Sequence, residues 1–353
     1  MKLEDMHFTI PKELEASAPP EARGQPRDHA RLLVIHRDSG QIEHRRFYEI
    51  TDYLKAGDVV VLNISSTIPA ALPGVTSDGQ EIEMRLSSHF STTSNGGGRT
   101  WQAVFKPDSA VIQPGLRLAF GEGALTAVVK KKREDIPKLW EIQFDPTDRP
   151  ITSWLEILGR PIKYDYVTER WNLEYYQTTY AAVPGSSEMP SAGRAFTPEL
   201  LAKIEGMGVA LAQIILHTGV SNIDIETEQV EQHTMYEEWY QVSPEAAETI
   251  NAARARGGRI VAIGTTPTRT LETVADEQGI VHPGEGWTSL YITPGYRFKA
   301  IDALVTGLHE AKSTRLVLAT AFTGDQALVL RAYQEAIAEG YLWHEFGDLS
   351  LIL

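Results

Sequence analysis

A turn between a short apolar run and an expected helix carries the residue types best suited to bind a ligand. In the stretch RIVAIGTTPTRTLETV (259–274), the β-branched run stops at Gly264, and a helix is expected from about Pro267. The start of a helix points free backbone N–H groups toward the preceding turn, where a carboxylate or a sugar hydroxyl can accept them. The side chains that could complete such a pocket are Thr265, Thr266, Arg269 and Glu272. An ordinary capped helix with a surface Arg–Glu pair explains the same residues, so both interpretations stay open.

Polar clusters also occur in three other segments that we place at strand ends. They are His217 in ILHTGVSN (215–222), Tyr296, Arg297 and Lys299 in TPGYRFKAIDAL (293–304), and His309, Lys312 and Thr314 in TGLHEAKST (306–314). Histidine accepts and returns a proton near neutral pH, which suits it to proton transfer. A lone histidine is more often a structural residue, but several clusters at strand ends favour a shared pocket.

Several kinds of chemistry find no support in the sequence. Cysteine is absent, which excludes disulfides, a thiol nucleophile and thiolate metal ligands. The Walker A loop, the GxGxxG loop, the GxSxG elbow and the HExxH zinc motif are also absent. The ten histidines are scattered without ligand spacing. We therefore expect no metal site.

Charge and hydropathy favour a cytoplasmic enzyme or binding protein. The net charge of −14 argues against broad, non-specific nucleic-acid binding, although it leaves room for a local basic site. The N-terminal segment (1–17) is too polar for a signal peptide, and no apolar run approaches membrane-spanning length. We therefore expect no membrane partner, while the oligomeric state stays open.

Strands and helices alternate in the C-terminal half, and two further strands lie near the N-terminus. The expected strands are RLLVI (31–35), DVVVLNI (58–64), VALAQIIL (209–216), RIVAI (259–263), SLYIT (289–293) and TRLVLATAF (314–322). Expected helices begin at Pro198, Pro244 and about Pro267, and a last one covers 325–339. Continuous apolar strands alternating with amphipathic helices predict an α/β fold with a mainly parallel sheet covered on both faces.

Residues 70 to 148 follow a different pattern, which predicts a second domain. Short runs such as EIEMRL and WEIQF alternate apolar and polar residues, and turns such as SNGGGR and QPG separate them. No helix-length periodic segment interrupts them, so we expect an inserted antiparallel β-barrel. The 353-residue chain then divides into a discontinuous α/β domain, 1–69 and 149–353, and a barrel domain, 70–148.

Read in order, several segments resemble the S-adenosylmethionine:tRNA ribosyltransferase-isomerase family of queuosine biosynthesis. These segments include LKAGDVVVLN, YYQTTYA, PSAGRAFT, LHTGV, AIGTTPTRTLE, YITPGYRFKAIDALVT, AKSTRLVL and FGDLSLIL. The resemblance covers nearly the whole chain and implies an α/β domain interrupted by a β-barrel. It also implies transfer of the ribosyl part of S-adenosylmethionine to 7-aminomethyl-7-deazaguanine in a tRNA anticodon. The sugar is isomerised to an epoxycyclopentanediol, and adenine and methionine leave.

The resemblance suggests roles for the residues picked out above. S-adenosylmethionine is the implied co-substrate, with Arg269 at the helix start as a clamp for its carboxylate. His217 and His309 are the candidates for proton transfer, because the reaction needs a base for the proton beside the sulfonium. The full set of candidate S-adenosylmethionine contacts is Gly193, Thr265, Thr266, Arg269, Glu272, Tyr296, Lys312 and Thr314.

The chain also departs from the family pattern at positions that bear on tRNA and catalysis. Where the family has arginines this chain has Ser66 and Ala71, and where it has histidines this chain has Ala195 and Tyr236. Arginines contact phosphates and histidines move protons. The resemblance therefore predicts an S-adenosylmethionine-dependent transferase-isomerase with the family's tRNA reaction as the main hypothesis. Two alternatives stay open: use of S-adenosylmethionine on another, possibly small-molecule, acceptor, and a non-catalytic S-adenosylmethionine-binding protein.

Overall fold

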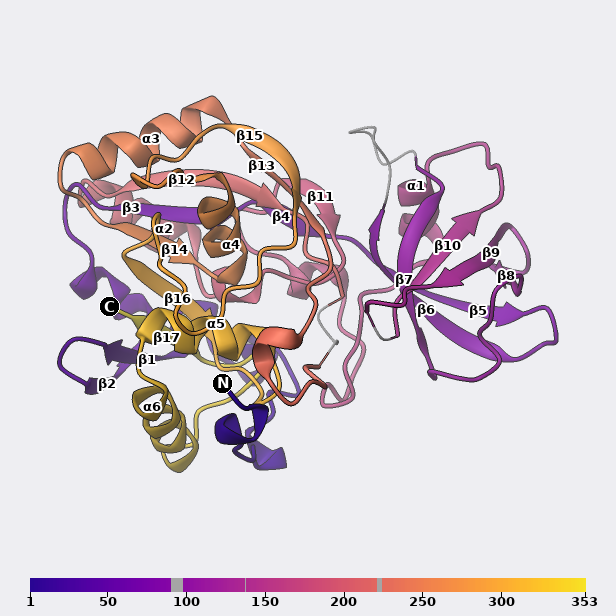
Figure 1. Ribbon diagram of the computed structural model, residues 1–353, viewed down its shortest axis with the longest axis horizontal. Helices are drawn as coiled ribbons and strands as arrows, with labels where there is room; N and C mark the ends of the chain where they lie inside the picture. Colours follow the sequence, from indigo (N-terminus) through magenta and orange to yellow (C-terminus); the bar gives the residue numbers. More distant parts are fainter. Residues whose placement is uncertain (90–97, 137, 221–223) are drawn as a thin grey trace.

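The computed structural model describes residues 1–89, 98–136, 138–220 and 224–353. In Figure 1 a large sheet with helices on both faces forms one body, and a smaller barrel forms a second body beside it. The expected glycine-rich turn SNGGGR (94–99) lies mostly outside the described residues.

The large sheet has nine strands and is parallel in its centre. Its spatial order is β15 (Gly284–Thr288), β13 (Glu238–Val242), β12 (Ala210–Leu216), β3 (Val59–Asn63), β14 (Ile260–Ile263), β16 (Ala303–Gly307), β17 (Leu349–Ile352), β1 (Arg31–His36) and β2 (Gln41–Arg46). Strands β12, β3, β14 and β16 run parallel, as do β17 and β1. The remaining pairs are antiparallel, so the expected α/β fold is confirmed with a mixed sheet.

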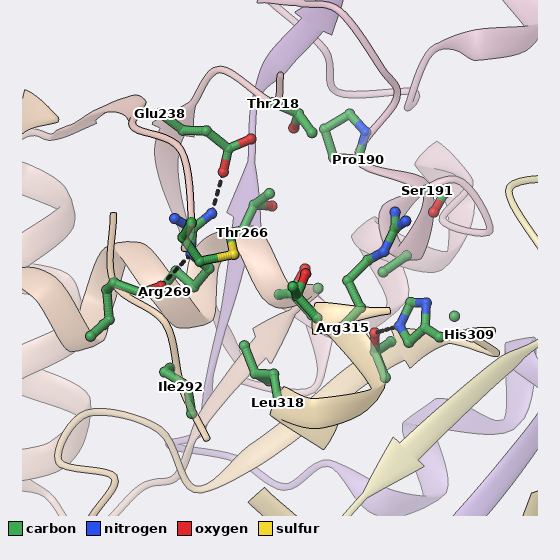
Figure 2. Close-up of a pocket in the computed structure, with 18 of the residues that line it drawn as sticks. Pro190, Ser191, Thr218, Glu238, Thr266, Arg269, Ile292, His309, Arg315 and Leu318 are labelled. Atoms are coloured by element: carbon green, nitrogen blue, oxygen red, sulfur yellow. Dashed lines mark hydrogen bonds and ion pairs between the residues drawn. The ribbon is translucent and has the colours of Figure 1, made fainter. Parts of the chain in front are cut away.

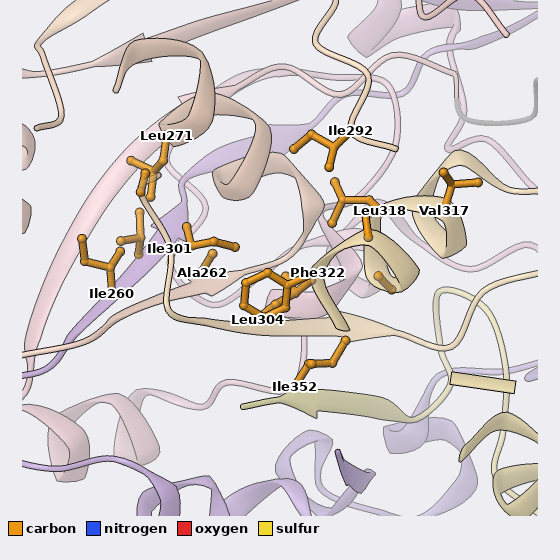
Figure 3. Close-up of a cluster of buried hydrophobic side chains, with 14 of the residues drawn as sticks. Ile260, Ala262, Leu271, Ile292, Ile301, Leu304, Val317, Leu318, Phe322 and Ile352 are labelled. Atoms are coloured by element: carbon orange, nitrogen blue, oxygen red, sulfur yellow. The ribbon is translucent and has the colours of Figure 1, made fainter. Parts of the chain in front are cut away.

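Both faces of the sheet are covered, because its central strands are apolar on both sides. In β3, Val59 and Val61 pack into one core, whereas Val60 and Leu62 pack into the other. The first core also contains residues of α3 (Pro244–Ala255), α4 (Thr265–Val274), α5 (Thr314–Thr323) and α6 (Gln326–Ala338). Figure 3 shows part of it, where strand side chains such as Leu304 face Leu318 and Phe322 of α5. The second core contains α2 (Pro198–Gly206) and η5 (Phe47–Tyr53).

Short 3-10 helices occupy many of the connections. They are η1 (Leu3–Met6), η2 (Lys12–Leu14), η3 (Pro20–Arg23), η4 (Arg27–His29), η6 (Leu173–Tyr176), η7 (Ser191–Gly193) and η8 (Val230–Gln232). A two-stranded parallel sheet of β4 (Ser65–Thr67) and β11 (Val183–Ser186) continues from the end of β3. It brings the segment after β11 next to the ends of the central strands.

Two expected strands are wrong. TRLVLATAF (314–322) forms helix α5, and its run of apolar residues is continuous because most of the helix is buried. Its start is fixed by Ser313, whose hydroxyl accepts a hydrogen bond from the Leu316 N–H at 3.1 Å. SLYIT (289–293) has no regular structure, and the edge strand is the preceding β15. The polar cluster at 306–314 therefore precedes a helix rather than a strand.

The inserted barrel agrees with its expected class. It is closed in the order β10 (Trp140–Phe144), β7 (Thr100–Lys106), β6 (Glu81–His89), β5 (Ala71–Thr76), β8 (Arg117–Phe120), β9 (Leu125–Lys132), and every pair is antiparallel. Helix α1 (Ile151–Leu158) packs against it through Ile151 and Leu155. The barrel touches the α/β body where the Ser187 hydroxyl donates to the Ser87 carbonyl at 2.7 Å. The exact domain boundaries stay a prediction.

Candidate active site

Two adjoining cavities lie at the carboxyl ends of β14 and β16. The first cavity, of about 90 Å³, is bordered by Thr265 and Thr266 after β14 and by Thr306 on β16. The second cavity, of about 500 Å³, lies in the size range of small-molecule sites. The two cavities share Met189, Ser191, Gly307, His309 and Arg315 as walls. The two cavities are therefore neighbours, and Figure 2 shows Ser191, His309 and Arg315 of this shared wall together with Thr266 and Arg269.

The turn between β14 and α4 borders the first cavity. Gly264 has a φ of 102°, which a side chain would strain, and this conformation turns the chain from the strand directly into the helix. The Thr266 hydroxyl accepts a hydrogen bond from the Asn63 side chain at 3.2 Å, which ties the turn to the end of β3. Thr265 and Thr266 are thus brought together at a cavity, as the pattern indicated.

Arg269 also borders the first cavity, but its guanidinium is engaged by the protein. Nε donates to the Leu290 carbonyl at 2.9 Å, and Nη2 donates to the Thr288 carbonyl at 3.2 Å. Nη1 pairs with the buried carboxylate of Glu238, as Figure 2 shows. Every nitrogen of this side chain therefore has a protein acceptor, which favours a structural role over a carboxylate clamp.

Glu272 and Tyr296 contact each other outside the two cavities. The Glu272 carboxylate accepts the backbone N–H groups of Lys299 and Ala300 at 2.9 Å and the Tyr296 hydroxyl at 3.2 Å. These bonds hold the loop before β16 against α4. Neither residue is among the described residues that line either cavity.

His309 lies where the two cavities meet. Its Nε2 is 2.7 Å from the Thr306 hydroxyl, and burial together with the nearby Arg315 lowers its pKa to about 3. The imidazole is therefore neutral at pH 7. When Nε2–H donates to the Thr306 hydroxyl, Nδ1 carries the lone pair that can accept a proton.

His217 lies apart from His309. Its Nδ1 is 2.7 Å from the Ser65 hydroxyl, and its ring stacks on Trp239 with 5.1 Å between centroids. It is not among the described residues bordering the cavities, although its neighbour Thr218 borders the first one. The structure therefore brings only one of the two candidate proton-transfer histidines to a cavity wall.

The remaining candidate contacts divide between the cavities and their surroundings. Thr314 borders the first cavity, and Lys312 borders the second one. Gly193 is close to the Tyr180 hydroxyl, which would lie 1.8 Å from a Cβ at this position. It is required for packing behind Ser191 and Ala192, which border the first cavity.

The structure also locates the four residues that differ from the family pattern. Ala71 is fully buried in the barrel strand β5, and Ala195 is buried in the second core of the sheet. Ser66 lies in β4. Tyr236 borders the first cavity, and its hydroxyl donates to the Val220 carbonyl at 2.9 Å.

The second cavity has a charged wall that the motif analysis missed. Besides Arg315, it contains Glu188, Glu310, His344 and Glu345. Of these, only Glu310 falls inside a segment that the motif search considered, and the others are separated from it by long stretches of sequence. Their convergence depends on the loop after β11 and the loop before β17 meeting the start of α5. No spacing rule could have paired them.

Charges in this wall alter the pKa values of two carboxyls in opposite directions. Burial raises the pKa of Glu345 to about 8, and the carboxylate of Glu188 adds to the effect. Burial also tends to raise the pKa of Glu310. The hydrogen bond to His344 at 2.8 Å and the charge of Arg315 outweigh this effect and lower the pKa to about 2. The wall therefore holds one carboxyl that is protonated near neutral pH and one that is ionised.

The described residues contain neither a metal-binding cluster nor a membrane-spanning helix. No group of three or more histidine, aspartate or glutamate side chains in this part of the chain could hold a metal ion. No helix in the described ranges has the length and apolarity needed to cross a bilayer.

Comparison with known proteins gives a consistent result over the full length. The family model described as "Queuosine biosynthesis protein" matches residues 3–352. The S-adenosylmethionine:tRNA ribosyltransferase-isomerases of Symbiobacterium thermophilum and Moorella thermoacetica are 43% and 42% identical, with 100% of each chain covered. The crystal structure of S-adenosylmethionine tRNA ribosyltransferase from Thermotoga maritima is 34% identical, covers 99% of this chain and 100% of its own, and has a TM-score of 0.54. The chain therefore belongs to the queuosine biosynthesis protein family.

Proposed function

We propose that this protein is a cytoplasmic S-adenosylmethionine:tRNA ribosyltransferase-isomerase. The observation that carries the proposal is full-length identity of about 40% to several enzymes of that name. The cavities support it independently, because the segments that resemble the family's motifs converge on them. The acceptor is a tRNA that bears 7-aminomethyl-7-deazaguanine, and the product is epoxyqueuosine. Adenine and methionine are released.

The two cavities are suited to this reaction in several ways. Hydroxyls and backbone N–H groups of the Thr265–Thr266 turn can hydrogen-bond the ribose of S-adenosylmethionine. His309 lies at the boundary between the cavities and is the candidate base for the proton that the adjacent sulfonium acidifies. Its pKa of about 3 makes it a weak base in the ligand-free protein, so this role requires the bound substrate to raise that pKa. Burial of these groups removes water that would compete for the activated sugar.

Two other hypotheses remain distinct from this proposal. In one, the protein uses S-adenosylmethionine on a small-molecule acceptor, and in the other it only binds S-adenosylmethionine. Two features favour these hypotheses, because both weaken contacts with tRNA phosphates. They are the net charge of −14 and the uncharged side chains of Ser66 and Ala71.

Product analysis by mass spectrometry separates all three hypotheses. The protein is incubated with S-adenosylmethionine alone, with tRNA carrying the 7-aminomethyl base, and with the same tRNA carrying unmodified guanine. We expect adenine, methionine and epoxyqueuosine only with the 7-aminomethyl tRNA. Adenine release without tRNA modification would indicate another acceptor, and binding without any release would indicate a non-catalytic protein. Either result would refute the proposal.

A further inference from the structure

A row of three aromatic rings crosses one edge of the large sheet. Trp239 of β13 and Trp287 of β15 are directly opposite each other in the antiparallel pairing, so their side chains point to the same face. His217, which follows β12, stacks on Trp239 with 5.1 Å between the ring centroids and 22° between the ring planes. The row therefore extends over three neighbouring strands and ends at β15, the edge strand of the sheet (Figure 1).

The outer end of this row is open to solvent. Trp287 is 40% exposed, and Glu285 and Gln213, whose side chains point to the same face of the sheet, are exposed as well. A cross-strand aromatic pair stabilises an edge strand even when nothing binds to it. Exposure of Trp287 alone therefore does not indicate a ligand, and the surroundings of the row decide the question.

The inner end of the row adjoins the first cavity. Thr218 and Glu238 border that cavity, and they are the chain neighbours of His217 and Trp239. Neighbouring Cα atoms are about 3.8 Å apart. A polymeric ligand with one unit at the first cavity therefore has its next unit within reach of the row.

The barrel brings a basic segment to the same edge of the sheet. The connection that follows β9 packs on the start of β13, where Ile136 and Leu139 share a small apolar cluster with Tyr236. Beside this cluster, Arg133 forms an ion pair with Glu237 at 3.2 Å. The last residues of β9 are therefore held next to the strand that carries Trp239.

Two lysines of this segment have charges that the protein does not neutralise. Lys130 and Lys132 are exposed, and neither forms an ion pair with any residue that the structure describes. Their neighbours are engaged, because Lys131 pairs with Glu141 at 3.6 Å and Arg133 pairs with two carboxylates. On a chain with a net charge of −14, these two ammonium groups form a local site for anions.

We propose that Trp239 and Trp287 form a stacking platform for a nucleotide next to the reacting base of the tRNA, with Lys130 and Lys132 at the phosphates. The proposal rests on the proposed function, which supplies the RNA. A flat indole face and unpaired ammonium groups match the two chemical parts of a single-stranded nucleotide. His217 is a positioning residue in this arrangement, because its ring holds Trp239 in place.

A second copy of this chain is the competing occupant, because an edge strand can pair with another strand. Such pairing uses the backbone groups of β15 and needs neither the indole faces nor the lysines. The combination of Trp287 with Lys130 and Lys132 therefore favours a nucleotide.

Fluorescence anisotropy with a labelled anticodon stem–loop RNA tests the platform without turnover. One RNA carries 7-aminomethyl-7-deazaguanine at the reacting position, and the other carries guanine. Trp287→Leu should weaken the binding of both RNAs by about 5- to 150-fold, because stacking of a neighbouring base does not depend on the reacting base. Trp287→Phe should keep most of the affinity. Binding of S-adenosylmethionine, measured by calorimetric titration, should be the same in both variants as in the wild type.

The matched control is Tyr48→Leu, because Tyr48 is also 40% exposed but lies in η5 and borders neither cavity. It should bind both RNAs like the wild type. Unchanged RNA affinity in folded Trp287→Leu, or an equal loss in Tyr48→Leu, would overturn the platform. Sedimentation tests the competing occupant: a wild-type dimer that Trp287→Leu converts to a monomer with unchanged RNA affinity would assign the row to a second copy.

The lysines provide a test that does not depend on the folding of a tryptophan variant. The double variant Lys130→Gln and Lys132→Gln should flatten the slope of log affinity against log salt by about 0.7 to 0.9 for each phosphate contact removed. Lys55→Gln is the control, since Lys55 is exposed before the start of β3, at the other end of that strand from the cavities. Equal slopes for the wild type and the double variant would overturn the proposal.

Turnover separates the platform from the proposed function. Trp287→Leu should raise the KM for the 7-aminomethyl tRNA, with little change in kcat and none in the KM for S-adenosylmethionine. Wild-type turnover with an unchanged KM for tRNA in Trp287→Leu would overturn the platform and leave the proposed function intact. RNA binding that depends on Trp287, without any product from the wild type, would refute the proposed function and leave the platform intact.

Discussion

At the scale of single residues, the two arginines near the cavities have opposite roles. Arg269 belongs to the turn motif that the sequence makes conspicuous. Its guanidinium, however, is already paired with Glu238 and hydrogen-bonded to two backbone carbonyls. Arg315 lies inside the AKSTRLVL segment (311–318) but was not among the candidate contacts, yet its guanidinium is the one that faces the cavity. Sequence identifies a charged residue near a strand end, but it does not reveal whether another buried charge already neutralises it.

Replacement of Arg269 by alanine should act mainly on stability. The change leaves the Glu238 carboxylate buried, with the Gly219 N–H at 2.7 Å as its remaining partner. Loss of one partner of a buried ion pair typically costs about 3–5 kcal/mol. Urea unfolding should show a loss of this order for Arg269→Ala and almost none for Lys131→Ala, whose side chain is exposed on the barrel. Equal stability of the two variants would contradict the structural role of Arg269.

The raised pKa of Glu345 predicts a specific dependence of stability on pH. Its folded pKa of about 8 lies above the unfolded value of 4.5, so the folded state holds a proton that the unfolded state has released. The associated stability is fully present below pH 4.5 and is lost as the pH rises through 8, by at most about 1.4 kcal/mol per unit. The charged and titratable groups around this carboxyl are Glu188, Tyr166, Arg315 and Glu310.

Glu345→Gln keeps a neutral side chain at every pH and should remove this loss. The free energy of unfolding of the variant, relative to that of the wild type, should therefore be greater at pH 8.5 than at pH 5.5. Urea unfolding of both proteins at the two pH values measures the difference. A difference that stays constant with pH would show that Glu345 ionises normally in the folded protein.

At the scale of elements, helix α5 explains both a wrong prediction and a part of the site. Its apolar run was read as a strand because a fully buried helix has no polar face to produce a helical period. The Ser313 cap was the local signal for a helix, since serine before a run of good helix formers favours an N-terminus. By contrast, α3 was predicted correctly from Ser243 and Pro244, because its exposed face keeps the period visible.

Loss of the Ser313 cap should affect ligand binding as well as stability. Ser313→Ala removes the hydrogen bond to the Leu316 N–H, which typically costs about 0.5–2 kcal/mol, and loosens the turn that carries Arg315. Ser243→Ala is a matched control, because its hydroxyl caps α3 at the same 3.1 Å, far from the cavities. Both variants should lose similar stability in urea, but only Ser313→Ala should weaken binding of S-adenosylmethionine. Equal effects of the two variants on binding would show that the start of α5 does not contribute to the ligand site.

At the scale of the whole molecule, the alternation of strands and helices was enough to predict an α/β body with an inserted barrel. The barrel strands alternate apolar and polar residues along short runs such as Trp140–Phe144, which is a local property of the sequence. The turn at Thr265 and Thr266 could also be predicted, because the strand end, the turn and the helix start are contiguous in the sequence. The charged wall was not found, because Glu188, Arg315 and Glu345 meet only through the tertiary fold. Local patterns therefore predicted the scaffold better than the site.

The most direct test of the account follows the ribose itself. S-adenosylmethionine labelled with ¹³C in the ribose is incubated with the protein and tRNA that carries the 7-aminomethyl base, and the tRNA is digested to nucleosides. The account predicts that the labelled carbons appear in epoxyqueuosine, in an amount equal to the adenine released. Adenine release without label in the tRNA, or no release by folded protein that binds S-adenosylmethionine, would contradict it.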